Sequence, residues 1–100
     1  MRKLEGKVAL VTGSSRGIGA AIAERLAADG ASVVVNYVQA EREAEAVAER
    51  ARRAGVRAVV SKADVGDPTQ AVRLVEDAVK QMGRLDILVN NAVVLDLEPL

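Results

Sequence analysis

Short apolar segments alternate with longer amphipathic segments along the chain. The short segments are rich in β-branched residues and carry few polar positions; they cover 8–11, 32–35, 57–60 and 85–89. Such runs are typical of strands in a parallel sheet that is covered by helices. The longer segments, at about 17–29, 40–54 and 67–82, repeat apolar residues at helical spacing. The pattern predicts four strands and three helices in strict alternation.

Each helical segment has apolar residues at helical spacing, and those of the third segment are expected to face inward. In the first segment, Ile18, Ile22 and Leu26 lie four residues apart. The second and third segments gather their apolar residues on one side, namely Ala44, Val47, Ala48 and Ala51, and then Val72, Val75, Ala78, Val79 and Met82.

Local chemistry marks the ends of these helices. A glycine follows each one, at Gly30, Gly55 and Gly83, and glycine readily adopts the left-handed conformation that ends a helix. The third helix is expected to begin at the cap Asp67, with a proline in its first turn and Gln70 three residues after the cap. The order βαβαβαβ requires right-handed crossovers, and it predicts an α/β fold with a parallel sheet in the order 3-2-1-4.

Composition narrows the function classes. The 100 residues are half apolar, and the 14 basic residues balance the 14 acidic ones, so nothing indicates a nucleic-acid or anionic membrane partner. Tyr37 is the only aromatic residue, and there is no Cys or His, which leaves no thiolate or imidazole for catalysis or metal binding. Without an apolar run of about 20 residues or a signal-peptide core, we expect a soluble, cytoplasmic protein.

A glycine-rich segment, Thr12–Gly19, joins the first strand to the first helix. Gly13 allows a sharp turn, Gly17 allows a ligand to approach the backbone, and Gly19 allows the helix to pack closely on the sheet. The helix start then offers free N–H groups and partial positive charge to a pyrophosphate. An ordinary turn is the alternative, and the position between strand and helix disfavours it. No Lys-Ser or Lys-Thr follows the glycines, which excludes a Walker-type loop.

Three motifs at strand ends make the sequence resemble one enzyme family. Thr12–Gly19 has the form Thr-Gly-x-x-x-Gly-Ile-Gly, Asp64-Val65 closes the third strand, and Asn90-Asn91-Ala92 follows the fourth. These resemble the motifs of the short-chain dehydrogenase/reductase family, and most of all its 3-oxoacyl-carrier-protein reductase type. The resemblance implies a Rossmann-like three-layer fragment, a dinucleotide-binding half-domain over 1–100 that is truncated before the catalytic region.

The resemblance and the strand-end positions together predict a site for a nicotinamide dinucleotide. The predicted cofactor-binding residues are Gly13, Ser14, Ser15, Arg16, Gly17, Ile18, Gly19, Asn36, Tyr37, Asp64, Val65, Asn90, Asn91 and Ala92.

NADP(H) is favoured over NAD(H), because no Asp or Glu follows the second strand before Glu41 and Arg16 is placed to pair with a 2′-phosphate. Tyr37 is expected to cover the adenine edge of the cleft. Arg16 as a solvated loop charge, Asn36 as a strand-end residue and Asp64 as a turn residue remain alternatives.

The resemblance also implies hydride transfer between the nicotinamide and a carbonyl or alcohol, with a Tyr-x-x-x-Lys pair as the acid–base group. In these residues Glu41 lies four positions after Tyr37, so the catalytic Ser, Tyr and Lys are expected beyond Leu100, and no catalytic or metal site is predicted here. We therefore expect no useful turnover from the chain alone. Val93 stands where the family usually has Gly, and it would narrow the cleft or extend the strand.

The predicted fourth strand would be an open edge with the apolar run 87–89, beside a sheet face covered by one helix. This arrangement predicts a homodimer or domain swap through the open edge or face. The alternative function is a non-catalytic, dissected or engineered half-fold that self-associates without nucleotide. A methyltransferase is disfavoured, because it would carry an acid near Asn36 and leaves Asn90-Asn91-Ala92 unexplained.

Overall fold

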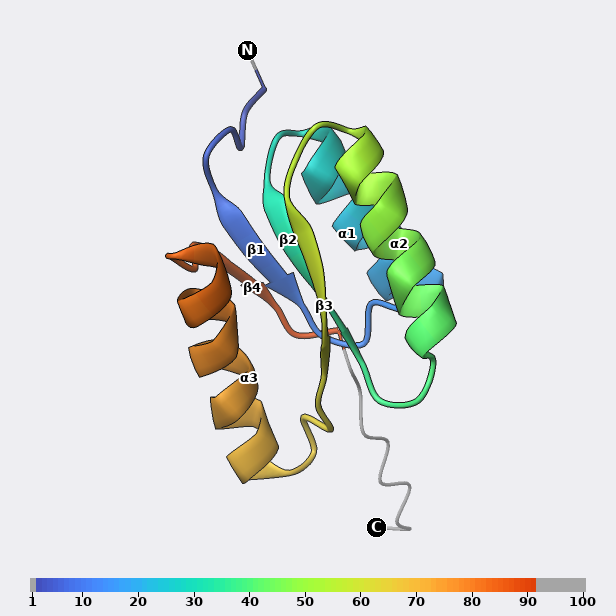
Figure 1. Ribbon diagram of the computed structural model, residues 1–100, viewed down its shortest axis with the longest axis vertical. Helices are drawn as coiled ribbons and strands as arrows, with labels where there is room; N and C mark the ends of the chain where they lie inside the picture. The colour runs from blue at the N-terminus through green and yellow to red at the C-terminus, as the bar shows by residue number, and fades with distance from the viewer. Residues whose placement is uncertain (1, 92–100) are drawn as a thin grey trace, which may run out of the picture.

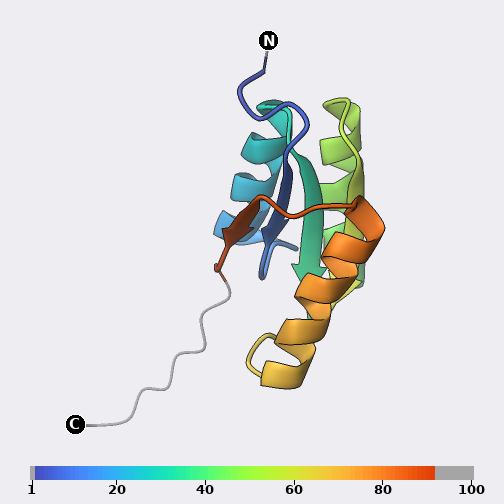
Figure 2. The same cartoon turned by 90° about the vertical axis from the view of Figure 1, so that its left-hand side faces the viewer.

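The computed structural model describes residues 2–91 and contains the alternating elements that the sequence predicts (Figure 1). In chain order these are β1 (Val8–Val11), α1 (Gly17–Ala28), β2 (Ser32–Tyr37), α2 (Glu41–Arg53), β3 (Ala58–Lys62), α3 (Pro68–Met82) and β4 (Ile87–Val89). The four strands are parallel and lie in the order β3-β2-β1-β4. Helices α1 and α2 cover one face of the sheet and α3 covers the other (Figures 1 and 2). The predicted α/β fold and strand order are confirmed.

Strand β1 has the predicted bounds, but the other three strands differ from the prediction at their ends. β2 and β3 both continue beyond the predicted apolar runs, because Asn36 pairs with Ser61 and Tyr37 pairs with Lys62 in the sheet register. These positions lack the apolar pattern on which the sequence prediction relied. β4 begins only at Ile87.

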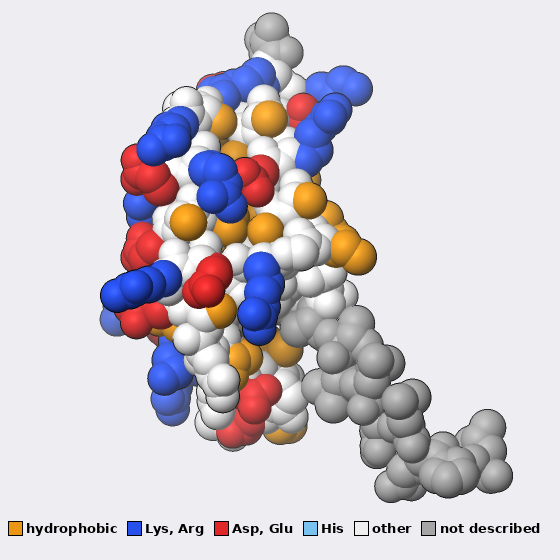
Figure 3. Space-filling model, turned by 90° about the vertical axis from the view of Figure 1, so that its right-hand side faces the viewer, with side chains coloured by type: hydrophobic (Ala, Val, Ile, Leu, Met, Phe, Trp, Pro, Cys, Tyr) orange, Lys and Arg blue, Asp and Glu red, His pale blue; other side chains and the backbone are white. Residues whose placement is uncertain are grey.

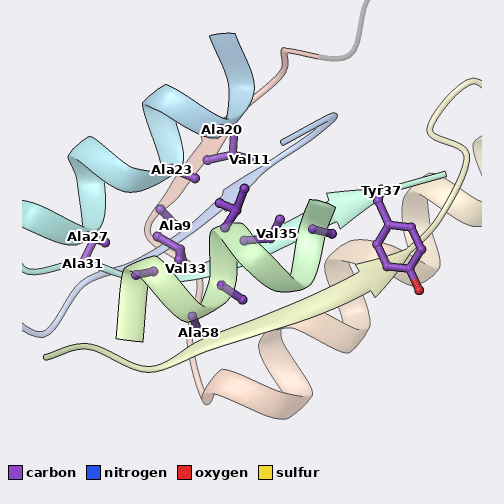
Figure 4. Packing of buried hydrophobic residues seen from close by; sticks show 14 residues of the cluster. Ala9, Val11, Ala20, Ala23, Ala27, Ala31, Val33, Val35, Tyr37 and Ala58 are labelled. Atoms are coloured by element: carbon purple, nitrogen blue, oxygen red, sulfur yellow. The ribbon is translucent and has the colours of Figure 1, made fainter. Parts of the chain in front are cut away.

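The face under α1 and α2 is packed almost entirely with alanine and valine (Figure 4). Ala23 and Ala27 of α1 have no exposed surface, and they pack in one cluster with Ala9 of β1 and Val33 of β2. Small side chains let the helix axis approach the sheet closely, which gives dense packing without large residues.

The apolar residues that recur four positions apart in α1 are not buried alike. Ile18 is 75% exposed, whereas Ile22 and Leu26 are partly buried against the core. The buried side of the helix consists of the small residues Gly19, Ala20, Ala23 and Ala27. In this close contact, the residues of α1 that face the sheet are its smallest ones, and the spacing of large apolar residues does not identify them.

The predicted inward face of α3 is partly wrong. Val72 and Val79 are 58% and 42% exposed, and the buried residues are Leu74, Ala78 and Met82, with Val75 partly buried beside them. The helix is apolar on two sides, and only one of them rests on the sheet. Periodicity alone could not distinguish the two sides.

The helix ends agree with the predicted signals. Gly30, Gly55 and Gly83 all have positive φ, and the N–H of Gly83 donates to the Val79 carbonyl at 2.8 Å. At the start of α3, the Asp67 carboxylate accepts from the Thr69 N–H at 3.0 Å. Gln70 extends this cap, because its Nε2 donates to Asp67 at 3.1 Å while its Oε1 accepts from the Asp64 N–H at 2.8 Å.

The outer edge of β3 is closed by an arginine. The Arg57 carbonyl accepts from the Val33 N–H at 3.0 Å and so faces β2. The next carbonyl, that of Ala58, points to the opposite side because successive strand residues alternate in direction. There the Arg52 guanidinium donates two hydrogen bonds to it, at 3.1 and 2.9 Å.

The side of the molecule formed by α2 presents charges of both signs, interspersed rather than segregated (Figure 3). Some of them pair across helices, as Arg50 of α2 does with Glu24 of α1 at 2.6 Å. This side therefore carries no patch of a single charge.

We expect Ala23→Leu to destabilise the fold, because a larger side chain would have to enter the contact between α1 and the sheet. Overpacking of this kind costs about 1–3 kcal/mol of unfolding free energy, and urea denaturation would measure the loss. Ala21→Leu is the matched control, since Ala21 is exposed on the same helix. Equal effects of the two substitutions would contradict the close packing described here.

Asp67→Ala should destabilise the protein in a pH-dependent way. Hydrogen bonds from the Gln70 side chain and then the Thr69 N–H hold the pKa of the Asp67 carboxyl below its ordinary value. The cap therefore contributes fully above the unfolded pKa of about 3.9, and its contribution is lost as the pH falls through the lower folded pKa. Thermal melting at several pH values should show a gap between wild type and Asp67→Ala that closes on acidification. Glu76→Gln, on the exposed side of α3, should show no such closing gap.

Candidate functional site

The glycine-rich loop lies at the carboxyl end of β1 and leads directly into α1 (Figure 1). The N-cap Arg16 has extended backbone and makes no side-chain cap, and the first turn of α1 contains no acidic residue. The N–H groups of that turn therefore keep their capacity to bind an anion, and the helix dipole adds partial positive charge.

The glycines of the loop have different reasons for being glycine. Gly13 and Gly17 have φ values of 59° and 62°, which side chains rarely adopt. A Cβ on Gly17 would meet no atom within 4 Å, so the backbone there is open to an approaching group. A Cβ on Gly19 would collide with the Gly13 carbonyl and lie 2.6 Å from the Asn91 amide nitrogen. The close contact at Gly19 is thus with the loop and Asn91, and not with the sheet as the sequence suggested.

Two polar residues of the predicted set are buried inside this corner. Ser14 has no exposed surface; its hydroxyl donates to the Val11 carbonyl at 2.6 Å and accepts from the Asn36 N–H at 3.0 Å. Asn36 is 1% exposed, and its side-chain oxygen accepts from the Gly13 N–H at 3.0 Å. Both side chains therefore hold the loop in place through hydrogen bonds at the ends of β1 and β2.

A hollow of about 260 Å³ opens beside the loop. It is lined by Gly13, Ser15, Arg16, Tyr37, Val38, Gln39 and Ala40. The Arg16 side chain is exposed at this hollow. The three residues that follow Tyr37 were not predicted, and only their position after the second strand could have indicated them.

Tyr37 is buried against the first turns of α2, at the end of β2 beyond the alanine-rich core (Figure 4). Desolvation raises the pKa of its phenol above the ordinary value, and the nearby carboxylates of Glu41 and Glu45 raise it further. The phenol therefore stays protonated at neutral pH.

The loop after β4 is tied to the glycine-rich loop. The Thr12 hydroxyl donates to the Asn90 side chain at 3.3 Å and accepts from the Asn91 N–H at 2.9 Å. The Asn91 side chain donates to the Gly13 carbonyl at 3.2 Å. Thr12 was not among the predicted site residues, although its place directly before Gly13 in the motif is a usable signal. Ala92 and Val93 lie outside the described residues.

The segment after β3 lies on the other side of the sheet. Asp64 accepts from the Gly66 N–H at 2.9 Å, a contact that the turn interpretation of this residue anticipates. Val65 and Asn90 line a second hollow, of about 230 Å³, together with Leu10, Thr12, Gly66, Ala71, Leu74, Val75 and Leu88. The structure thus brings Val65 and Asn90 together, apart from the hollow that contains Arg16 and Tyr37.

Two other kinds of site can be checked over residues 2–91. Within that range, no three or more carboxylates are grouped so that they could hold a metal ion. In the same range, no helix combines the length and apolarity needed to cross a membrane.

Comparison with known proteins gives the same family for sequence and structure. The family described as short chain dehydrogenase matches residues 7–100. An uncharacterized oxidoreductase of Methylorubrum extorquens is 58% identical over 96 residues, which are 96% of this chain and 39% of that protein.

Two solved structures are similar to this chain. A short chain dehydrogenase from Burkholderia cenocepacia, in complex with NADP, is 50% identical with a TM-score of 0.89 and is matched over 92% of this chain and 38% of its own. A blue fluorescent protein from a metagenomic library, in complex with NADPH, is 49% identical with a TM-score of 0.88 and is matched over 97% of this chain and 40% of its own.

The chain spans about two-fifths of the length of these relatives. The matched part contains the glycine-rich loop, the ends of all four strands and the helices between them. The chain belongs to the short chain dehydrogenase family.

Proposed function

We propose that this chain is the NADP(H)-binding part of an oxidoreductase, with residues 1–100 forming a dinucleotide-binding half-domain. The observation that carries the proposal is the start of α1, where an open glycine backbone precedes N–H groups that no side chain of the N-cap satisfies. A helix start of this kind binds a pyrophosphate through its N–H groups and its dipole. Similar structures solved with NADP and NADPH support the choice of ligand.

The adenosine end of the ligand is assigned to the hollow beside the loop. Arg16 reaches this hollow from the loop side, and Tyr37 and Gln39 line it from the end of β2. A guanidinium pairs with a phosphate through charge-assisted hydrogen bonds, and the lining contains no carboxylate that would repel one. These features favour a 2′-phosphate, and so NADP(H) over NAD(H).

The remaining proposed contacts come from the segments that follow β2, β3 and β4. The proposal gives the adenine edge to Tyr37 and to Asp64-Val65, and it keeps Asn90 and Asn91 as dinucleotide contacts after β4. The nicotinamide of a bound NADPH supplies a hydride for a carbonyl substrate. The acid–base residues that the family uses are not among these 100 residues, so we propose that turnover requires residues outside them. A cytoplasmic location is part of the proposal and rests on the sequence prediction alone.

The alternative function, self-association without nucleotide, is favoured by the surface around β4 and α3. Leu88 is 56% exposed and lines the apolar hollow of about 230 Å³, together with Leu74 and Val75 of α3. We propose a second copy of the chain as the partner that covers Leu88 and this hollow, because an uncovered apolar surface next to an open strand favours association. A copy seated there would also cover Val65 and Asn90, so it would compete with the nucleotide contacts proposed for those two residues.

Titration with NADPH and NADH should separate the two functions. We expect the chain to bind NADPH more tightly than NADH, and Arg16→Ala to weaken NADPH binding about tenfold through loss of a charge-assisted hydrogen bond at an exposed site. Arg25→Ala is the control, since Arg25 is exposed in the last turn of α1. Nicotinamide fluorescence or calorimetry gives the dissociation constants. If the chain binds neither NADPH nor NADH, the proposed nucleotide-binding function is rejected and self-association without nucleotide remains.

Sedimentation velocity should detect the proposed association in the absence of nucleotide. We expect wild type to form dimers and Leu88→Lys to form monomers, because a charge at that position would be buried without a partner. Ile18→Lys provides the control, since Ile18 is also an exposed aliphatic residue but lies on α1. A monomeric wild-type chain at concentrations near 100 µM, about the range of weak association, would remove this part of the proposal.

A further inference from the structure

The side chain of Asn36 is buried, and both of its amide hydrogens are already bonded within the protein. Its oxygen accepts from the Gly13 N–H at 3.0 Å, and its nitrogen donates to the carbonyls of Ser61 at 3.2 Å and Ala63 at 3.1 Å. An amide nitrogen carries two hydrogens, and both are used by these carbonyls. Its backbone is engaged as well, with Ser14, through a hydroxyl at 3.0 Å and an N–H at 2.9 Å.

The three side-chain contacts join parts of the chain that are distant in sequence. Gly13 precedes Asn36 by 23 residues, and Ser61 and Ala63 follow it by 25 and 27. One side chain thus connects the first residue of the phosphate-facing turn with the last residues before Asp64. Because Asn36 is 1% exposed and bonds three backbone groups through its side chain, this connection is costly to break.

We propose that Asn36 is a positioning residue of the nucleotide site and does not contact the nucleotide. Its side chain accepts a hydrogen bond from the Gly13 N–H. This bond fixes the position of the loop, and of the start of α1, relative to the ends of β2 and β3. This role rests on the proposed function. It replaces the predicted role of Asn36 as a cofactor contact, and it leaves the choice between NADP(H) and NAD(H) to the residues around the open hollow, Arg16 and Tyr37.

The chemistry of the contacts explains why an asparagine occupies this position. Aspartate has the same shape and would still accept from the Gly13 N–H, but it would set a carboxylate oxygen against the two carbonyls of Ser61 and Ala63. Alanine would leave the Gly13 N–H and both carbonyls without this partner. A buried group that loses its partner costs the full penalty of desolvation.

The role can be tested with two ligands that differ only in the 2′-phosphate, 5′-ADP and 2′,5′-ADP. We expect Asn36→Ala to weaken the binding of both about tenfold, with the ratio of the two dissociation constants unchanged. Asn36→Asp adds a carboxylate at the end of β2 that would repel a 2′-phosphate, so for this variant only the loss of 5′-ADP binding tests the role. Arg16→Ala should change that ratio, because it removes a contact to the 2′-phosphate alone. Ser61→Ala is the matched control: it keeps the carbonyl that Asn36 binds and should leave both affinities unchanged.

Amide hydrogen exchange provides a readout that a general loss of stability would not reproduce. In Asn36→Ala the Gly13 N–H should exchange faster, because it loses its acceptor, while the N–H groups of Leu10 and Val34 in the sheet interior stay protected. Asn36→Asp keeps an acceptor for this N–H and should leave its exchange slower than in Asn36→Ala. Unchanged exchange at Gly13 in folded Asn36→Ala would overturn the inference.

The outcomes separate this inference from the proposed function. If wild type binds neither ligand, the proposed function fails, and the role of Asn36 in a nucleotide site fails with it. If wild type binds both and Asn36→Ala loses affinity only for 2′,5′-ADP, the nucleotide site stands and Asn36 is a phosphate contact after all.

Discussion

The site depends on how a single glycine is held. Gly13 donates its N–H to Asn36 at the end of β2, and its carbonyl accepts from Asn91 after β4. These two strands flank β1 on either side in the sheet, so the turn that leaves β1 is fixed from both neighbours. This turn then fixes where α1 starts. Position 19 requires glycine, because the Gly13 carbonyl and the Asn91 side-chain amide leave no room there for a Cβ.

The sequence was sufficient for the parts of the fold that repeat or that have local chemistry. Apolar runs predicted the strands, and the glycines after each helix and the cap at Asp67 predicted the helix ends. The helix faces were harder, because α3 is apolar on two sides and α1 touches the sheet through its smallest residues. Hydrophobic periodicity weights large aliphatic residues, and it draws attention to Ile18, which is exposed, rather than to the alanines that are buried.

The candidate site was predictable in position and less so in the role of each residue. The loop, the strand ends and Arg16 follow from motifs and from the rule that ligands bind at the carboxyl ends of parallel strands. The role of Asn36 depends on hydrogen bonds with Ser61 and Ala63, which only the tertiary fold brings within reach. Asp64 likewise has both a turn contact and a place in a binding motif, and a motif alone cannot separate the two.

The arginine at the outer edge of β3 has a consequence for assembly. Arg52 occupies the carbonyl of Ala58 that a further strand would need, and β3 ends in the charged residue Lys62. Charged groups of this kind discourage strand addition. If two copies joined through β4, the combined sheet would have a β3 edge at each end. Neither edge would readily accept a further strand, so growth would stop at two subunits instead of continuing into a fibre.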